Sequence, residues 1–453
     1  MITKKQLSFI DLFAGAGGLS EGFIQAGFTP VAHVEMNKYA CQTLETRAAY
    51  HYLKSKGRRA LQKYYDYERG LITREQLLDC VPPEERESVI NKEMSSTTAK
   101  GIYHKIDYLM EKKRINHISV IIGGPPCQAY SLVGRAQTNH MLHPMEDDPR
   151  NELYKQYVNF LKRYQPEMFV FENVQGILSA RNGESFADLK RKLNEIHYTF
   201  ECHIQNAQTF GVMQNRKRMI IIGWRQGTNH FYPTFERQQI NTVVQDLLSD
   251  LPPVERGGQA DEYLLPFQNA SAYVRDNHIR TEDDVLTLHR ARIHNDRDVE
   301  IYRRTIHAWF DNNAHQRLRY NELPGGLKTH HNENSFVDRF KVLEADMPAC
   351  HTVLAHLAKD GHYFIHPDVN QCRSITVREA ARLQTFPDNY YFEGNRSAQF
   401  TQIGNAVPPM MAKGIAEEIK LQLRGEQRIV AAGIINMHGN KEIPKNIYIG
   451  ATI

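Results

Sequence analysis

The segment "LSFIDLFAGAGGLSEGF" (residues 7–23) decides the fold. Its apolar start (7–13) predicts a buried strand, its glycines predict a tight turn, and residues 18–26 predict a helix. Further apolar runs predict strands that alternate with helical patterns, one of them a helix at 151–164. These runs are "PVAHVE" (30–35), "HISVIIGG" (117–124), "EMFVFENV" (167–174) and "RMIIIGW" (218–224). The alternation predicts an α/β fold with a doubly wound, mostly parallel sheet, whose ligands lie beyond the carboxyl ends of the strands.

The length of the chain predicts more than one domain. Its 453 residues exceed the roughly 250–300 residues at which a single core usually stops growing. We expect a catalytic and cofactor-binding domain over 1–225, interrupted at 46–105 by a charged, tyrosine-rich helical insertion that forms a solvated excursion. Residues 226–370 lose the alternation and form a second, smaller domain. Residues 371–453 return to the first domain.

Composition excludes several classes of protein. No stretch approaches the ~20 apolar residues that span a bilayer, and the N-terminus has no secretory signal, so we expect a cytoplasmic protein without membrane contact. The net charge of +4 permits a polyanionic partner without requiring one. The six cysteines form no CxxC pair and no zinc spacing, which indicates reduced thiols and no metal site.

The glycine-rich turn is the first candidate site. Gly15, Gly17 and Gly18 follow the first strand, and Glu35 closes the second. Glycines let the backbone approach a ligand closely, and a carboxylate at the end of the second strand can accept hydrogen bonds from ribose hydroxyls. Ser20 stands where the dinucleotide pattern GxGxxG requires glycine. These residues alone leave open a nucleoside cofactor or a purely structural turn with a solvated acid.

The second candidate site is "IIGGPPCQAYS" (121–131), in which Cys127 follows a strand end and two prolines. A free cysteine is usually a small buried hydrophobe, but prolines restrict the backbone before this one. Glu172 follows another apolar run in "ENV", where it could also simply cap a helix. A thiol and an acid at the carboxyl ends of one sheet favour nucleophilic catalysis with acid assistance.

Taken together, the motifs resemble the DNA (cytosine-5) methyltransferase family, in that family's order. "DLFAGAGG" resembles its cofactor motif, "GGPPCQAYS" its nucleophile motif and "ENV" its base-binding acid. "QNRKR" (214–218) matches a QxRxR pattern, and "RSITVREAARLQTFPD" (373–388) and "QIGNAVPP" (402–409) resemble the closing motifs. The resemblance implies a Rossmann-like S-adenosylmethionine-dependent methyltransferase fold, with a target-recognition domain at 226–370.

The resemblance also assigns roles to individual residues. It implies S-adenosylmethionine as the cofactor and catalytic roles for Cys127, Glu172, Arg216 and Arg218, with Arg218 the better candidate for the base carbonyl. Asp107 matches the acid that contacts the adenine amino group, although the insertion makes its distance in sequence from Glu35 unusually long. The cofactor-binding residues implied are Phe13, Gly15, Gly17, Gly18, Glu35, Asp107, Pro125 and Asn405.

The implied reaction methylates carbon 5 of a cytosine in a specific duplex DNA sequence. Cys127 would add to carbon 6 and Glu172 would stabilise the ring, after the cytosine has been flipped out of the helix. We expect a monomer whose partner is double-stranded DNA. The resemblance is to the restriction-modification type, in which a cognate endonuclease would be a functional partner that need not bind this chain. An anti-phage or orphan system stays open from the sequence.

Three alternatives remain open from the sequence. An RNA cytosine-5 methyltransferase would share the catalytic residues but would not need the long segment at 226–370. A nicotinamide dehydrogenase would explain the opening turn but neither the Pro-Pro-Cys nor the ENV motif. A non-catalytic DNA-binding regulator would need a broken site, whereas Cys127, Glu172 and Arg218 are all present.

Overall fold

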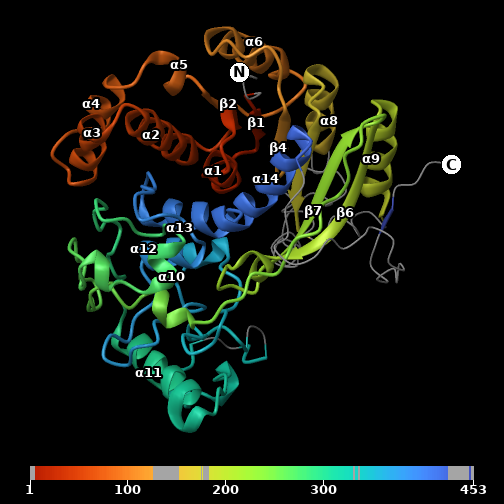
Figure 1. Ribbon diagram of the computed structural model, residues 1–453. Helices are drawn as coiled ribbons and strands as arrows, with labels where there is room; N and C mark the ends of the chain where they lie inside the picture. Colours follow the sequence, from red (N-terminus) through yellow and green to blue (C-terminus); the bar gives the residue numbers. More distant parts are fainter. Residues whose placement is uncertain are drawn as a thin grey trace, which may run out of the picture.

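The computed structural model describes most of the chain (Figure 1). The described residues are 6–125, 153–174, 176, 183–329, 332–334, 337–426 and 448–449. Cys127 lies outside the described residues, so its predicted role is carried by the sequence motif.

A single sheet forms the centre of the first part of the chain. Its order is β3-β2-β1-β4-β5-β7-β6-β8, with parallel pairing from β3 to β5 and antiparallel pairing from β5 to β8. This confirms the predicted α/β fold with a mostly parallel sheet. The strands are β1 (Ser8–Leu12), β2 (Thr29–Glu35), β3 (Val89–Asn91), β4 (Val120–Gly123), β5 (Met168–Asn173), β6 (Tyr198–Asn206), β7 (Lys217–Arg225) and β8 (Tyr448–Ile449).

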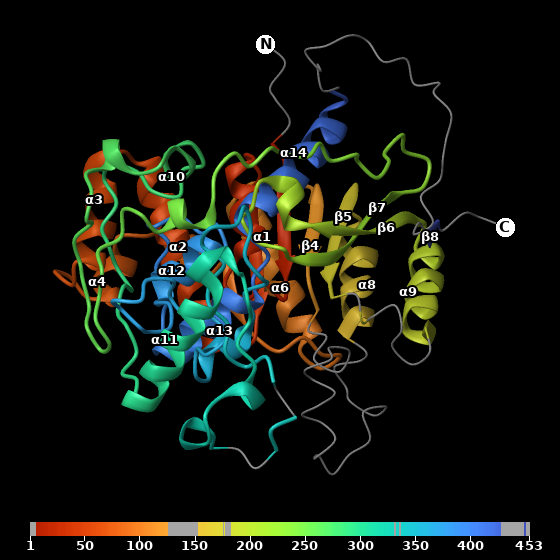
Figure 2. The ribbon, with the colours of Figure 1, turned by 90° about the horizontal axis from the view of Figure 1, so that it is seen from below.

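The strands bury side chains on both faces of the sheet. In β1, Ile10 and Leu12 pack on one face, and Phe9 packs on the other. Helices α6 (Ala99–Lys112), α8 (Leu153–Tyr164) and α9 (Glu184–Glu195) cover the first face, and α1 (Gly18–Gln25) and α14 (Pro409–Arg424) cover the second. Figure 2 shows α14 above the strands with α8 and α9 below them. The core is therefore a three-layer α/β/α arrangement.

The expectation of a solvated helical excursion at 46–105 was wrong in two respects. The segment contains β3, which pairs with β2 and extends the sheet. Its helices also bury a tyrosine-rich cluster that includes Tyr50, Tyr64 and Tyr65. The helices here are α2 (Lys38–Ser55), α3 (Arg58–Glu68), α4 (Arg74–Asp79) and α5 (Pro83–Arg86). Aromatic rings gave these helices enough apolar surface to form a core of their own.

The segment 226–370 has a different character. Its longest helix is α11 (Asp296–Phe310), and α10 (Ala272–Asp276) is short. Strand pairing among its described residues is confined to isolated bridges. After this segment, α12 (Val377–Leu383) and α13 (Arg396–Asn405) lead to α14. Helix α14 packs closely on α1: a Cβ added at Gly22 would lie only 2.4 Å from the Cβ of Ala412.

Candidate active site

An acid and a guanidinium meet at one edge of the sheet. The Nε of Arg218 lies 2.9 Å from Oε1 of Glu172, and the two side chains are 12% and 14% exposed. Glu172 stands near the end of β5 and Arg218 near the start of β7, which pair in antiparallel register. The antiparallel pairing therefore brings residues 46 positions apart in sequence to the carboxyl edge of the parallel strands.

The same edge holds the start of the segment that carries Cys127. The side-chain amide of Asn173 donates to the carbonyl of Pro125 at 3.1 Å, and Asn173 is buried. A Cβ at Gly124 would lie 2.8 Å from Oε2 of Glu172, so glycine leaves room for the carboxylate. The strand end that carries the predicted acid and the corner that precedes the predicted nucleophile are thus tied together.

The glycine-rich turn is fastened to Glu35. Oε2 of Glu35 accepts from the Gly15 amide at 2.8 Å, and Oε1 accepts from the amides of Met36 and Asn37 at 3.0 and 2.8 Å. Gly15 has a φ of 54°, and a Cβ there would meet nothing within 4 Å. Phe13, at the start of the turn, also has a positive φ, of 59°. The turn therefore presents open space beside a fixed carboxylate.

The closing segment packs directly on this turn. A Cβ at Gly18 would lie 2.2 Å from the carbonyl oxygen of Val407, closer than real Cβ contacts allow. A Cβ at Gly17 would lie 2.6 Å from a Leu44 methyl group. Asn405, two residues before Val407, is exposed at the end of α13. The contact that the structure shows with the turn is therefore made by Val407, two residues after Asn405.

Arg216 occupies a different environment from Arg218. Its guanidinium is fully buried and donates to the carbonyls of Val353 at 2.8 Å and Gly404 at 3.3 Å. Burial lowers the pKa of this side chain well below its ordinary value. Arg216 precedes β7, so these bonds tie the start of that strand to Val353 and to Gly404 of α13, and Arg218 is the arginine beside Glu172.

The structure does not bring Asp107 to the cofactor edge. Helix α6 begins after β3 and runs back across the sheet, so Asp107 lies eight residues, about 12 Å, into it. Its carboxylate pairs with Arg163, in the last turn of α8 just before β5 begins. Asp107 therefore lies toward the edge opposite Glu35. Asp107 is far from Glu35 in sequence because of the insertion, and it falls within α6 rather than at the end of a strand.

Asn91, which the sequence analysis did not single out, lies beside Glu35, whereas Asp107 does not. It ends β3 in register with Glu35, and its amide donates to the carbonyls of Glu35 and Met36 at 3.2 and 3.0 Å. The "VIN" segment is too short for its periodicity to reveal a strand. Met36 next to it is 62% exposed, which leaves an apolar surface at this edge.

A buried polar trio under the turn was also missed. Ser20 donates to Asp11 and lies 3.0 Å from Nδ1 of His33. Burial raises the pKa of Asp11 to about 8 and lowers that of His33 to about 3, so burial favours the uncharged form of each group. The only sequence signal was an acid inside an apolar strand, which periodicity alone does not interpret.

The side chains at this edge can recognise a polar ring. A carboxyl and a guanidinium together can form hydrogen bonds with a ring nitrogen, an amino group and a carbonyl.

In the described part of the chain, no three His, Cys, Asp or Glu side chains are grouped so as to hold a metal ion. None of the helices described is both long and apolar enough to cross a membrane.

Comparison with known proteins identifies a family. The model of the family described as C-5 cytosine-specific DNA methylase matches residues 7–64 and 88–421. The unmatched residues 65–87 fall within the predicted insertion.

Individual relatives extend over nearly the whole chain. The type II methyltransferase M.Bpa9945I of Bacillus paralicheniformis is 41% identical, over 92% of this chain and 99% of the relative. The type II methyltransferase M1.HphI of Haemophilus parahaemolyticus is 28% identical, over 92% and 88%. A solved structure of a prophage-encoded DNA modification methyltransferase from E. coli aligns with a TM-score of 0.60 at 22% identity, over 92% of this chain and 99% of that one. The last likeness concerns the fold alone.

Proposed function

Because this chain belongs to the C-5 cytosine-specific DNA methylase family, we propose that it transfers a methyl group from S-adenosylmethionine to carbon 5 of a cytosine in duplex DNA. The observation that carries the proposal is the Glu172–Arg218 pair at the sheet edge, tied through Asn173 to the corner before Cys127. Cytosine offers this pair a ring nitrogen, an exocyclic amine and a carbonyl.

The residues at the glycine-rich turn fit the cofactor. Open space above Gly15 admits a ligand against the backbone, and Glu35 is held where a ribose would pass. The residues that would hold the cofactor are Phe13, Gly15, Gly17, Gly18, Glu35, Asn91, Pro125 and Asn405. When bound, S-adenosylmethionine supplies a methyl group activated by its sulfonium.

The protein side of the reaction makes carbon 5 of the cytosine nucleophilic. The Cys127 thiolate adds to carbon 6, and the electron pair moves into the ring toward N3. Glu172 would donate a proton to N3 as the electron pair arrives there, while Arg218 holds Glu172 in place and reaches the base carbonyl. Carbon 5 would then take up the methyl group that the bound cofactor supplies, and the proton would leave N3 again. Loss of the carbon-5 proton to a base restores the double bond between carbons 5 and 6, breaks the carbon–sulfur bond and frees the thiolate. A free thiol titrates near ~8.5, so the site must favour the anion or remove the proton as attack occurs.

The substrate must leave the helix for this chemistry to occur. Carbon 6 is inaccessible within a base-paired duplex, so the cytosine is flipped out, at a cost of a few kcal/mol in stacking. The catalytic residues contact only the flipped base, so its neighbours must be read elsewhere. We assign that role to residues 226–370.

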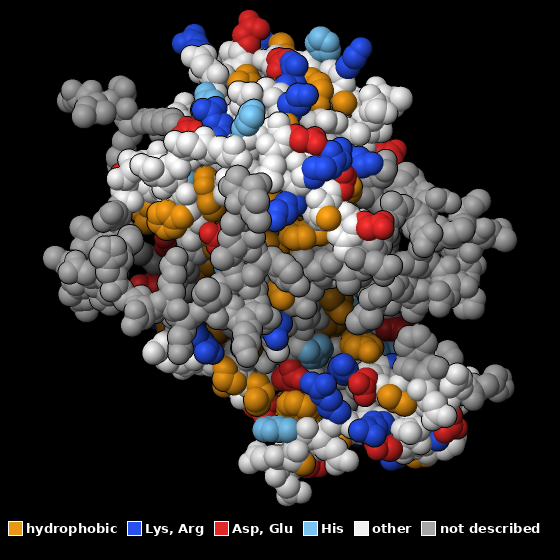
Figure 3. Space-filling model, turned by 90° about the vertical axis from the view of Figure 1, so that its right-hand side faces the viewer, with side chains coloured by type: hydrophobic (Ala, Val, Ile, Leu, Met, Phe, Trp, Pro, Cys, Tyr) orange, Lys and Arg blue, Asp and Glu red, His pale blue; other side chains and the backbone are white. Residues whose placement is uncertain are grey.

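The charged side chains of residues 226–370 do not by themselves show which residues contact the DNA bases. Arg303 and Arg304 both pair with Glu300, and Arg317 pairs with Glu344. On the side of the whole molecule seen in Figure 3, positive and negative side chains are intermixed over the coloured parts. An arginine in such an ion pair must leave its glutamate before it can bind a DNA phosphate. Recognition of the target sequence therefore depends on where side chains are placed rather than on net charge.

One experiment tests the reaction, the substrate and the target together. The chain is expressed in a host that lacks cytosine methylation, and the host DNA is analysed by bisulfite sequencing. We expect protected cytosines within one short recurrent sequence. Unmodified DNA from cells that contain folded protein would contradict the proposed reaction, and methylated tRNA in its place would favour the RNA alternative. Resistance of the same DNA to an endonuclease of matching specificity would support the restriction-modification role.

Replacing Arg216 is expected to lower stability, whereas replacing Arg218, the other arginine of the QxRxR motif, is expected to slow the reaction. Arg216→Met leaves two buried carbonyls without their donor and should lower the free energy of unfolding by about 2–4 kcal/mol. Arg218→Met should slow methyl transfer by at least about tenfold, because a positioned donor beside the base is lost. Thermal melts and single-turnover rates check both. Equal stability losses in the two variants would contradict the assignment.

The adenine contact is expected to depend on Asn91 rather than Asp107. Asn91→Ala should weaken binding of S-adenosylmethionine by about three- to tenfold, the effect of losing a hydrogen-bonding group at the pocket. Asp107→Ala should leave the dissociation constant unchanged, since that acid pairs with Arg163. Calorimetry on both variants measures this. Weaker binding in Asp107→Ala alone would restore the assignment made from the sequence.

A further inference from the structure

The back of the glycine-rich turn is held by a tyrosine from the far end of the chain. The hydroxyl of Tyr390 donates to the carbonyl of Ala16 at 2.5 Å, and both residues are buried. A Cβ at Gly17 would lie 2.9 Å from the same hydroxyl. Tyr390 therefore contacts the turn at Ala16 and Gly17, next to the open space at Gly15.

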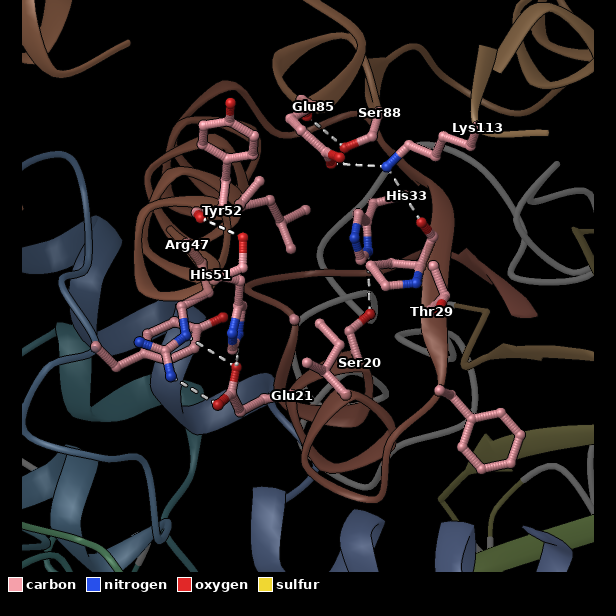
Figure 4. A pocket seen from close by; sticks show the side chains of 18 residues that line it. Ser20, Glu21, Thr29, His33, Arg47, His51, Tyr52, Glu85, Ser88 and Lys113 are labelled. Carbon is pink, nitrogen blue, oxygen red and sulfur yellow. Dashed lines mark hydrogen bonds and ion pairs between the residues drawn. The ribbon is translucent and has the colours of Figure 1, made fainter. Parts of the chain in front are cut away.

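Arg47 of α2 holds the ring of Tyr390 in turn. Its guanidinium carbon lies 4.7 Å from the ring centroid, and Nη1 donates to the backbone and side-chain oxygens of Asn389, each at 2.9 Å. The guanidinium also pairs with Glu21 of α1 at 2.6 Å, and His51 lies 2.9 Å from the same carboxylate. Figure 4 shows Arg47 and His51 converging on Glu21.

This network borders a cavity of about 310 Å³ between α1 and α2. The cavity extends to Thr29 and Lys113, at the edge where the strands begin (Figure 4). Its charged side chains are already paired, as Arg47 is with Glu21 and Lys113 with Glu85 at 2.7 Å. The cavity therefore lies next to the glycine-rich turn, and Arg47 and Tyr390, which contact each other, both line it.

Residues of the insertion fasten the segment around Tyr390. Tyr64 of α3 donates to the carbonyl of Asn389 at 2.8 Å. Tyr67 and Thr46 donate to Glu393 at 2.7 and 2.5 Å. The residues on either side of Tyr390 are therefore anchored to helices that the sequence suggested were solvated.

We propose that Tyr390 is a positioning residue for the cofactor turn, held in place by Arg47 and, through the insertion, by Tyr64. A turn fixed before binding costs less conformational entropy when the ligand arrives, so this contact raises affinity for the cofactor. The inference rests on the proposed function, since it takes the turn to bind S-adenosylmethionine. It assigns the insertion the task of pre-ordering that turn.

The hydroxyl separates positioning from packing. Tyr390→Phe keeps the ring against Arg47, Phe386 and Phe392 but removes the donor to Ala16. Tyr64→Phe removes the hydrogen bond to the carbonyl of Asn389, the residue before Tyr390, and so tests whether the insertion holds Tyr390 in place. Tyr391→Phe is the matched control, because the ring of Tyr391 packs on Tyr67 and lies one position away.

Two measurements on each full-length variant test the proposal. Hydrogen–deuterium exchange of the free protein, read by mass spectrometry, reports the protection of residues 13–18. Steady-state methylation of duplex DNA separates KM for S-adenosylmethionine from kcat, and calorimetry gives the dissociation constant. Thermal melts show that each variant is folded.

We expect Tyr390→Phe to exchange faster over 13–18 and to raise KM and the dissociation constant about three- to tenfold, the range for loss of one hydrogen bond, with kcat unchanged. Tyr64→Phe should shift both quantities in the same direction by less. If Tyr390→Phe does not fold, Tyr64→Phe decides alone.

Exchange and KM that match the Tyr391→Phe control in both variants would overturn the proposal. If the unchanged chain binds no S-adenosylmethionine, the proposed function fails. The exchange measurement then still decides whether Tyr390 orders the turn.

Discussion

Replacing Cys127 with serine is expected to abolish methyl transfer while binding of S-adenosylmethionine stays near that of the unchanged chain. The thiolate is accessible near neutral pH because a free thiol titrates near ~8.5, whereas a serine hydroxyl stays protonated. The substitution changes one atom and leaves Pro125 and its bond to Asn173 in place. Incorporation of labelled methyl groups into duplex DNA measures the loss, and calorimetry measures cofactor binding.

A matched control uses another cysteine. Cys80 is exposed at the end of α4, so Cys80→Ser should retain full turnover. DNA with 5-fluorocytosine at the target should remain covalently attached to the unchanged chain and to Cys80→Ser, but not to Cys127→Ser. Turnover by Cys127→Ser close to that of the control would remove Cys127 from the mechanism.

Glu172→Gln is expected to slow methyl transfer by about 10²–10⁴-fold, the usual contribution of a positioned acid or base. The amide keeps the shape of the side chain but neither supplies a proton nor carries the charge that N3 requires. It also breaks the ion pair with Arg218, whose Nε lies 2.9 Å from the carboxylate. Single-turnover rates at saturating cofactor and DNA measure the chemical step.

Glu201→Gln provides the comparison for this variant. Glu201 lies on β6, the strand beside β7, and faces His203 at 3.0 Å rather than Arg218. Both variants should melt near the temperature of the unchanged chain. A Glu172→Gln rate within about threefold of the Glu201→Gln rate would contradict the proposed role.

Periodicity predicted the buried strands well, because a strand buried on both faces is apolar throughout. β1, β2, β4, β5 and β7 all lie where apolar runs predicted them. β6 was missed although Tyr198, Phe200 and Cys202 alternate on its buried side, because Thr199 and Glu201 separate them and leave no continuous apolar run. The short β3 was missed because it has too few residues to show a period.

The positions of candidate site residues, as distinct from their roles, follow most directly from the sequence where a motif ends a strand. Glu172 and Glu35 lie at such ends, and the parallel sheet brings these ends to one edge. Arg216 and Arg218 look equivalent in sequence, yet one is buried on backbone carbonyls and the other meets Glu172. Residues two apart in a strand point the same way, so strand alternation alone would place both arginines in one environment. Arg216 instead precedes β7 (Lys217–Arg225), and only the tertiary structure shows that it is buried away from Glu172.

The sequence alone determined the family, the α/β class and the chemical types at the site, since these depend on local patterns and on motifs in order. Only the tertiary structure decided which distant residues meet. The bond from Tyr390 to Ala16 joins positions 374 apart, and the displacement of Asp107 from Glu35 follows from the direction of α6. Such contacts depend on strand order, on helix direction and on how the insertion packs. No local pattern encodes them, because each is set by the burial of surfaces contributed by separate parts of the chain.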